Sequence, residues 1–201
     1  MGYDRQRISF IQGAGSEGVF KYDGIRAGPD GRLYCAPSNA STVLVIDPGT
    51  QTSSFIASAG SGGLKYWGIC AGPDGRLYCA PLNASTVLVI DPETRTLSFI
   101  EGAGQGYAGI CAGPDGRLYC APANASTVLV IDPGTQTLSF IGGAGGGGMK
   151  YIGICAGPDG RLYCAPYSAS TVLVIDPGTQ TLSFIGGAGG GTKYNLSLIH
   201  I

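Results

Sequence analysis

One segment recurs four times along this 201-residue chain. The run AGPDG begins at Ala27, Ala71, Ala112 and Ala156, and each copy continues through runs similar to RLYCAP and NASTVLVIDP. The copies are spaced by 44, 41 and 44 residues, and nearly all of the variation falls in the glycine-rich segments between them. A repeat of this length is typical of a solenoid or a propeller, in which each unit stacks on its neighbours to bury its apolar surface.

Each copy predicts four short strands joined by tight turns. In the second copy, residues 72–75 (GPDG) predict a hairpin turn, because proline presets the first turn position and glycine accepts the left-handed one. The run TVLVI is apolar on both faces, which is typical of a strand that is buried from both sides. The strands expected in this copy are 66–71, 76–80, 86–90 and 96–100, with further turns at 83–85 and 91–94.

These patterns predict an all-β protein, either a β-propeller or a propeller arc of four four-stranded antiparallel blades. The blades are expected at about 22–56, 66–100, 107–141 and 151–185, in a single domain that covers 1–195. An N-terminal orphan strand is expected at 7–11, because RISFI resembles the last strand of each copy, TLSFI. Such a strand either completes the sheet of a last blade or is the remnant of a lost blade.

The last six residues, 196–201, read LSLIHI. The codons CTG TCT CTT ATA CAC ATC encode this run and resemble a transposase sequencing adapter read in frame. We therefore expect the tail to be non-native and the natural chain to be longer, which leaves the number of blades open.

The runs GPDGRLYCAP and NASTVLVIDPETRT resemble tandem β-propeller repeats of the YVTN and NHL-like type, and are closer still to uncharacterised algal and bacterial repeat proteins. The resemblance covers roughly residues 7–194 and implies a propeller that serves as a scaffold, sensor or surface-layer protein. A more remote similarity to the gluconolactonase and regucalcin group implies a channel metal held by glutamate, asparagine and aspartate. The chain departs from that set, because none of its glutamates (Glu17, Glu93 and Glu101) lies in a first strand.

Charge and composition exclude several classes of function. The net charge of -1 gives no reason to expect nucleic acid or an anionic membrane as a partner. No apolar run reaches the roughly 18 residues that a membrane-spanning helix needs, and MGYDRQRISF lacks the apolar stretch of a secretory signal, so no compartment is predicted. No cofactor is expected, because no glycine run continues into GKS or GKT.

The seven cysteines are predicted to be buried thiols, with a disulfide framework as the alternative.

The glycine loops and the residues after them are expected to lie on one rim of the propeller. Aromatic side chains with a nearby lysine can stack on a sugar or bind the carboxylate of a peptide, although packing between blades explains them equally. The predicted binding residues are Lys65, Tyr66, Trp67, Tyr107, Lys150 and Tyr151. Asn39, Asn83 and Asn124 each begin an N-glycosylation motif, and the alternative is a turn asparagine that tolerates a left-handed backbone.

On the opposite rim the turns carry eight aspartates, which suggests a calcium-binding ring, but each copy also has an arginine that is expected to neutralise them. Near-identical blades offer the same groups everywhere, so a unique site must lie where the copies differ. Those departures contain no histidine and no nucleophile beside a base, and Glu93 and Arg95 are expected to pair. The departures are Arg26, Trp67, Glu93, Arg95, Glu101 and Tyr167.

These features predict a non-enzymatic β-propeller scaffold, a fragment of a longer chain, that binds a protein, a peptide or a glycan. The alternative is a metal-dependent, lactonase-like or other hydrolytic propeller. A purely structural extracellular repeat is a third hypothesis. No metal ligands are predicted.

Overall fold

The computed structural model describes residues 10–11, 18–56 and 58–187. These residues form sixteen β-strands and no helix, arranged in four separate four-stranded sheets. Within each sheet the strands follow one another in chain order and pair antiparallel. Each sheet is therefore a meander, as the repeat predicts.

The strand bounds are nearly the same in every blade. The first blade contains β1 (Tyr22–Ala27), β2 (Leu33–Pro37), β3 (Val43–Asp47) and β4 (Thr52–Ile56). The second contains β5 (Tyr66–Ala71), β6 (Leu77–Pro81), β7 (Val87–Asp91) and β8 (Thr96–Ile100). The third contains β9 (Tyr107–Ala112), β10 (Leu118–Pro122), β11 (Thr127–Asp132) and β12 (Thr137–Gly142), and the fourth β13 (Tyr151–Ala156), β14 (Leu162–Pro166), β15 (Val172–Asp176) and β16 (Thr181–Ile185).

The turn between the first and second strands depends on both of its glycines, for different reasons. In the third blade Gly116 has a φ of 81°, which favours glycine. Gly113 has no such φ, but a Cβ built on it would lie 2.7 Å from the ring of Tyr119, whose hydroxyl donates to Asp115 Oδ2 over 2.8 Å. The first glycine therefore makes room for the tyrosine, and the second permits the turn.

The turn between the third and fourth strands is fixed by an aspartate side chain. In the first blade Asp47 Oδ1 accepts hydrogen bonds from the backbone N–H groups of Gly49 and Thr50, at 2.9 and 3.1 Å. The next residue, Gln51, is left-handed with a φ of 55°. The other blades repeat this arrangement, so both predicted turns have a clear local cause.

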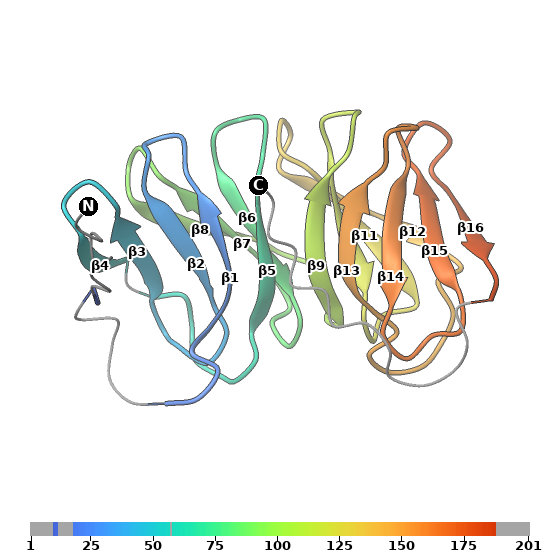
Figure 1. Cartoon of the computed structure of the whole chain (residues 1–201), viewed down its shortest axis with the longest axis horizontal. Coiled ribbons are helices and arrows are strands. Elements are labelled where there is room, and N and C mark those ends of the chain that lie inside the picture. Colours follow the sequence, from blue (N-terminus) through green and yellow to red (C-terminus); the bar gives the residue numbers. More distant parts are fainter. Residues whose placement is uncertain (1–9, 12–17, 57, 188–201) are drawn as a thin grey trace, which may run out of the picture.

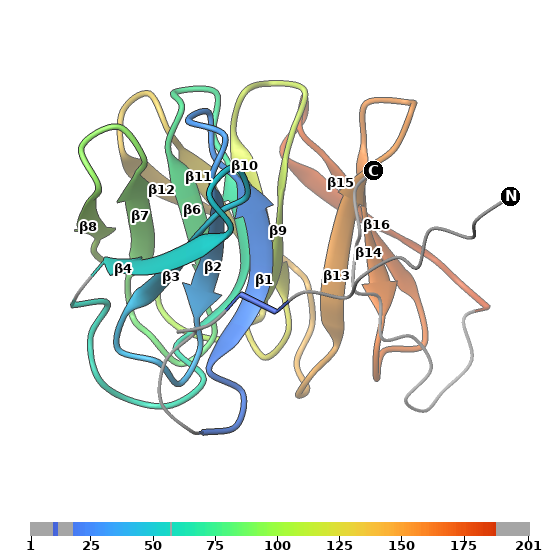
Figure 2. The same ribbon diagram turned by 60° about the vertical axis from the view of Figure 1, so that its left-hand side comes forward.

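The four sheets stand side by side in an arc and converge at their first strands (Figures 1 and 2). Direct contacts join β1 to β5, β5 to β9 and β9 to β13. The backbones meet closely there, because a Cβ on Gly68 would lie 3.2 Å from Gly109 Cα and one on Gly109 would lie 2.5 Å from Ile152 O. Glycine at the third position of the first strand is therefore what lets the blades converge.

Two rims follow from this arrangement. The turns between first and second strands and between third and fourth strands form the upper rim, drawn uppermost in Figure 1. The remaining turns and the glycine loops that join successive blades form the lower rim.

Each blade has two apolar faces. We call the face toward the preceding blade the leading face and the one toward the following blade the trailing face. Between the third and fourth blades, the trailing face contributes Cys111, Tyr119, Ala121, Val128, Val130 and Ile141, and the leading face contributes Tyr151, Ile154, Leu162, Cys164, Leu173 and Ile175. Equivalent clusters fill the other two interfaces, so the core lies between blades and not within one.

The prediction of an all-β propeller arc of four blades is confirmed, and the predicted strands of the second copy agree with the structure to within one residue at each end. All seven cysteines are free and six are buried, as predicted, and burial raises the pKa of Cys35 and of Cys111 to about 11. Most of the strand predicted at 7–11 lies outside the described residues, and Phe10 and Ile11 are in no strand. The tail at 196–201 also lies outside them.

Candidate functional site

On the upper rim an arginine in every blade bridges two aspartates. In the first blade Arg32 lies 3.2 Å from Asp30 and 3.3 Å from Asp47. The other three blades repeat both contacts at 3.5 to 3.9 Å. Hydrogen bonds from the backbone, the Thr50 N–H first, lower the pKa of Asp47. The expected neutralisation is therefore confirmed, and within the described ranges no three carboxylate, thiol or imidazole groups are placed to hold a metal.

The two predicted lysines point back between blades. Lys65 is buried, and its Nζ donates to the carbonyl oxygens of Ala40, Ser38 and Gly62, at 2.7, 3.0 and 3.3 Å. Lys150 is bound in the same way to Ala125, Ala123 and Gly147. Burial lowers the pKa of both lysines. Each ammonium thus clamps the lower rim of one blade to the next.

The three predicted tyrosines are also buried at the blade interfaces. Each hydroxyl shares a hydrogen bond with a threonine of its own blade, near the start of the third strand. The pairs are Tyr66 with Thr86 at 3.2 Å, Tyr107 with Thr127 at 2.8 Å and Tyr151 with Thr171 at 3.2 Å. Among the six predicted binding residues, only Trp67 is partly exposed.

The predicted glycosylation residues tie two glycine loops together. Asn39 donates from Nδ2 to Val19 O at 2.9 Å and accepts from the Leu64 N–H at 2.7 Å. Asn83 and Asn124 each make one of these two bonds, at 3.1 and 2.7 Å. None of the three asparagines is left-handed, so the backbone explanation for them is wrong. All three are exposed, and their glycosylation stays a prediction.

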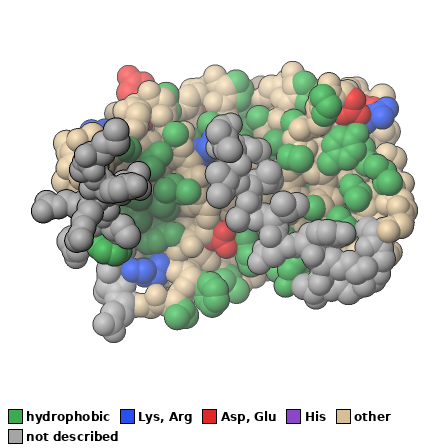
Figure 3. Space-filling view, viewed as in Figure 1, with side chains coloured by type: hydrophobic (Ala, Val, Ile, Leu, Met, Phe, Trp, Pro, Cys, Tyr) green, Lys and Arg blue, Asp and Glu red, His purple; other side chains and the backbone are tan. Residues whose placement is uncertain are grey.

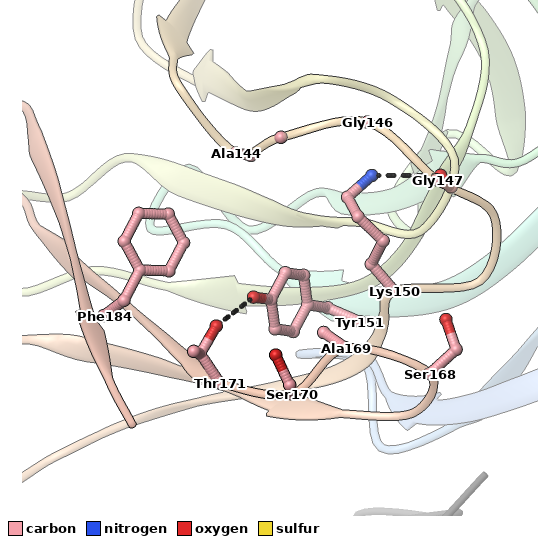
Figure 4. Close-up of a pocket in the computed structure, with 11 residues that line it drawn as sticks. Ala144, Gly146, Gly147, Lys150, Tyr151, Ser168, Ala169, Ser170, Thr171 and Phe184 are labelled. Carbon is pink, nitrogen blue, oxygen red and sulfur yellow. Dashed lines mark hydrogen bonds between the residues drawn. The ribbon is translucent and has the colours of Figure 1, made fainter. Parts of the chain in front are cut away.

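A groove of about 420 Å³ opens on the lower rim between the third and fourth blades (Figure 4). The glycine loop 145–147 forms one wall, and residues 168–171 with Phe184 form the other. Lys150 and Tyr151 line it, but their polar atoms are already bonded to Gly147 and Thr171. The groove therefore offers a ligand mainly backbone groups, serine hydroxyls and the ring of Phe184.

A second candidate site emerges where the blades differ most. When the four copies are aligned from the first strand to the last, only two positions carry a different residue in every blade. One is the second residue of the first strand, and the other directly follows the second strand. The residues are Asp23, Trp67, Ala108 and Ile152 at the first position, and Ser38, Leu82, Ala123 and Tyr167 at the second.

The structure brings these two positions together. Six of the eight residues, joined by Met149, form one apolar cluster on the lower rim, which we call the inner cluster. Its buried floor is Leu82, Ala108, Ala123 and Ile152, and the partly buried Trp67, Met149 and Tyr167 pack against it. The backbone explains the meeting, because Lys150 N donates to Ala123 O and Gly106 N to Leu82 O, at 2.8 and 2.7 Å.

Asp23 adds a carboxylate beside this cluster. It occupies the position in β1 that Trp67 occupies in β5, and these two strands are in contact. No hydrogen bond or ion pair joins Asp23 to any other described residue. Burial raises the pKa of Asp23 to about 6, so this acid is partly desolvated and uncompensated.

Sequence reasoning identified Trp67 and Tyr167 as departures from the repeat but missed the rest of the inner cluster. The signal was present in the alignment of the copies, since these are the two positions at which no residue is shared. Their meeting in space was not visible, because the contacts between the two positions cross from one blade to the next.

Comparison with known proteins supports the fold. No protein-family model and no curated protein matches the sequence. Among solved structures, virginiamycin B lyase from Staphylococcus aureus is similar with a TM-score of 0.69 and 16% identity, over 81% of this chain and 54% of that one. Hydrazine synthase from Kuenenia stuttgartiensis matches with 0.64 and 22%, over 89% and 53%. An auxiliary nutrient binding protein from Bacteroides thetaiotaomicron matches with 0.63 and 20%, over 88% and 44%.

The chain is a β-propeller repeat protein. It spans about half the length of the solved structures that it matches. At these identities the similarity concerns the fold alone. No helix within the described ranges is long and apolar enough to cross a membrane.

Proposed function

We propose that this propeller is a non-enzymatic binding scaffold that holds its ligand on the inner cluster. One observation carries the proposal: the two positions at which every blade differs meet in one place. A repeat that served only to stack would need the same residues at every interface, as it has in the three cores. A binding surface needs different shapes and charges from different blades, because the ligand does not share the symmetry of the repeat.

Burial supports this interpretation over neutral drift at an unconstrained surface. Leu82, Ala108, Ala123 and Ile152 are all buried, so changing their size changes the shape of a packed surface. Trp67 and Tyr167 stand partly exposed beside that floor. Large aromatic side chains that are half-buried next to a desolvated apolar patch are the residues that contribute most to binding protein segments.

The chemistry favours a peptide segment that presents an apolar side chain beside a positive charge. Asp23 lacks a counter-charge, and a Lys or Arg of the ligand would supply one. The face of Trp67 attracts the same cation. The similar auxiliary nutrient binding protein, by its name, binds a nutrient, which supports a binding role for this fold.

Trp67 provides a direct test, because it is the only tryptophan in the chain. Its fluorescence is to be titrated with short peptides that pair Leu or Phe with Arg, with the same peptides carrying Glu in place of Arg, and with a neutral oligosaccharide. We expect the basic peptides alone to change the emission. Tyr167→Ala should weaken their binding about tenfold or more, whereas Glu93→Gly, on the upper rim, should not.

Two results would contradict the proposal: no emission change with any basic peptide, or binding that survives Tyr167→Ala unchanged. Stronger binding of the oligosaccharide would instead indicate that the inner cluster binds a glycan.

The alternative, a hydrolytic propeller with a channel metal, is tested on the same protein. Elemental analysis of the purified chain, together with lactone hydrolysis before and after chelation, separates the two. A bound divalent metal and an activity that chelation removes would reverse the ranking. The fold similarity to virginiamycin B lyase makes this measurement worthwhile.

A further inference from the structure

We propose that the groove between the third and fourth blades binds a neutral sugar, and that the boundary between the first and second blades carries a second site of the same construction. Both sites lie at boundaries inside the arc. None of the residues that line the groove belongs to the inner cluster, so the inference is independent of the peptide ligand proposed there.

The groove combines one aromatic ring with uncharged hydrogen-bonding groups. Figure 4 shows the Phe184 ring on one side, the glycine loop on another, and the hydroxyls of Tyr151, Thr171 and Ser170 lining the space. The Ser170 hydroxyl and the backbone groups of Gly145 and Gly146 make no hydrogen bond to any described residue. A sugar ring suits this set, because its C–H face stacks on an aromatic ring while its hydroxyls bond to the polar groups around it.

The hydroxyl pair of Tyr151 and Thr171 adds one more donor. The two oxygen atoms lie 3.2 Å apart, and either can donate to the other. Two hydroxyl groups carry two protons, and the bond between them uses only one. The remaining O–H can therefore donate to a sugar oxygen.

The charge of the groove favours a neutral ligand. Lys150 is the only charged residue among those that line it, and its ammonium is already held by the carbonyls of Ala123, Ala125 and Gly147. The face of the arc in Figure 3 likewise shows sparse charged side chains among hydrophobic and uncharged ones. No free charge is thus available in the groove to attract an acidic or a basic group.

The glycine loop that forms one wall recurs at the boundary between the first and second blades. Residues 59–65 read AGSGGLK and residues 144–150 read AGGGGMK. Their left-handed positions agree, with φ values of 109° at Gly62 and 111° at Gly147, and of 50° at Leu64 and 48° at Met149. The two loops therefore have the same shape.

Both loops are fixed by the blade that follows them. Asn83 Nδ2 donates to Gly63 O at 3.1 Å, and Ser168 Oγ donates to the matching Gly148 O at 2.7 Å. The wall is thus preformed before a ligand binds, which lowers the entropic cost of binding.

The aromatic ring recurs as well. The fourth residue of the last strand is Phe99 in the second blade, Phe140 in the third and Phe184 in the fourth, and these rings are 42%, 48% and 48% exposed. Each lies opposite a leucine of the leading face, so each points toward the preceding blade at an internal boundary. The second and third blades have neighbours on both sides, so the exposure of these rings does not come from the ends of the arc.

The middle boundary lacks the wall. Between Ala103 and Tyr107 the loop is three residues shorter than its counterparts, and Gly106 replaces the lysine. Gln105 donates to Asn83 O at 2.7 Å across this boundary. Phe140 therefore has an exposed ring without the loop that completes a groove, which makes it the matched control.

Two equivalent sites on one chain suit a polymer that repeats its own unit. A neutral polysaccharide can occupy both, and the second contact is then intramolecular and raises the overall affinity without any new type of contact.

Affinity electrophoresis of the full chain through gels that contain a soluble β-glucan, a soluble glucomannan or polygalacturonate tests the proposal. We expect at least one of the two neutral polymers to retard the protein and the acidic one to leave its mobility unchanged. Phe99→Ala and Phe184→Ala should each weaken the apparent affinity about tenfold, and the double variant should abolish retardation. Phe140→Ala should leave retardation intact. Circular dichroism and the emission of Trp67 verify that all variants are folded.

Three results would overturn the proposal. The first is no retardation of the wild-type chain by either neutral polymer, and the second is an equal loss of affinity in Phe140→Ala. The third is loss of retardation in Tyr167→Ala while both groove variants still bind, which would place the sugar on the inner cluster.

Discussion

The upper and lower rims of the arc are built from the same repeat, yet they differ in how far the blades agree. On the upper rim every blade has the same aspartate, arginine and aspartate, held together by the same contacts. On the lower rim the second residue of the first strand and the residue after the second strand differ in every blade. These differing residues form the inner cluster, with Asp23 beside it.

This contrast separates two kinds of constraint. Groups that shape a single blade must be present in all of them, so they repeat. Residues that contact a ligand need not be the same in every blade, because the ligand does not share the symmetry of the repeat. The lower rim holds both kinds, because Lys65 and Lys150 make matching hydrogen bonds to the blade before them, whereas the positions of Trp67 and Tyr167 carry a different residue in every blade.

The largest effect is expected from Gly113→Ala on the upper rim. A Cβ there would lie 2.7 Å from both the ring of Tyr119 and Asp115 Oδ1, so the turn must distort. We expect a loss of about 2–3 kcal/mol in the free energy of unfolding, measured in urea. Gly142→Ala on the lower rim is the control, since its Cβ would meet no atom within 4 Å, and it should change stability by less than about 1 kcal/mol. Equal losses of stability in the two variants would contradict the expectation that only the upper-rim glycine is sterically required.

Lys65→Met tests whether the lower-rim lysines hold blades together or bind ligand. The methionine keeps the apolar stem but leaves the carbonyls of Ala40 and Gly62 without the ammonium donor. We expect a loss of about 1–3 kcal/mol in unfolding free energy. Gln105→Ala, an exposed side chain at the next boundary, should cost less. Unchanged stability together with lost peptide binding would instead make Lys65 a ligand contact.

Asp23→Asn and Asp132→Asn should respond to pH in opposite directions. The pKa of Asp23 is raised to about 6, so the folded state holds its proton more tightly and stability falls as the pH rises from about 4 to about 6. The Asp23 variant escapes this penalty and should be more stable than wild type at pH 7.5, with no gain at pH 4.

On the upper rim the backbone N–H of Thr135 lowers the pKa of Asp132, so its contribution is present at neutral pH and is lost as the pH falls through the folded-state pKa. Its variant should therefore be less stable than wild type at pH 7.5, and the difference should shrink in acid. Denaturant melts at the two pH values measure both. Shifts of the same sign would contradict the assignment of Asp23 as a desolvated acid.

The smallest effect is expected from restoring the repeat at one upper-rim turn with Glu93→Gly and Arg95→Gln. The expected Glu93–Arg95 pair is wrong, because Arg95 instead donates to Ser54 Oγ at 2.9 Å. A glutamine in this place reaches the preceding blade's tyrosine elsewhere in the chain. One exposed contact replaces another, so thermal unfolding should change by less than about 0.5 kcal/mol. A larger change would show that the second blade differs functionally on this rim too.

The sequence by itself determined the strands, the turns and the need for stacking, because each depends on residues close together in the chain. One such turn is shaped by Asp115, Gly116 and Tyr119, which lie within five residues of one another. The apolar runs likewise indicate that both faces of each sheet are buried, although they do not say which part of the protein covers each face.

Only the tertiary structure decided where the lower-rim side chains go. The carbonyls that bind Lys65 belong mostly to the preceding blade, and the inner cluster collects residues from three blades. These contacts depend on how closely successive blades approach, as at Gly68, where a Cβ would lie only 3.2 Å from Gly109 Cα. No short stretch of sequence encodes that approach, because the two residues belong to different blades.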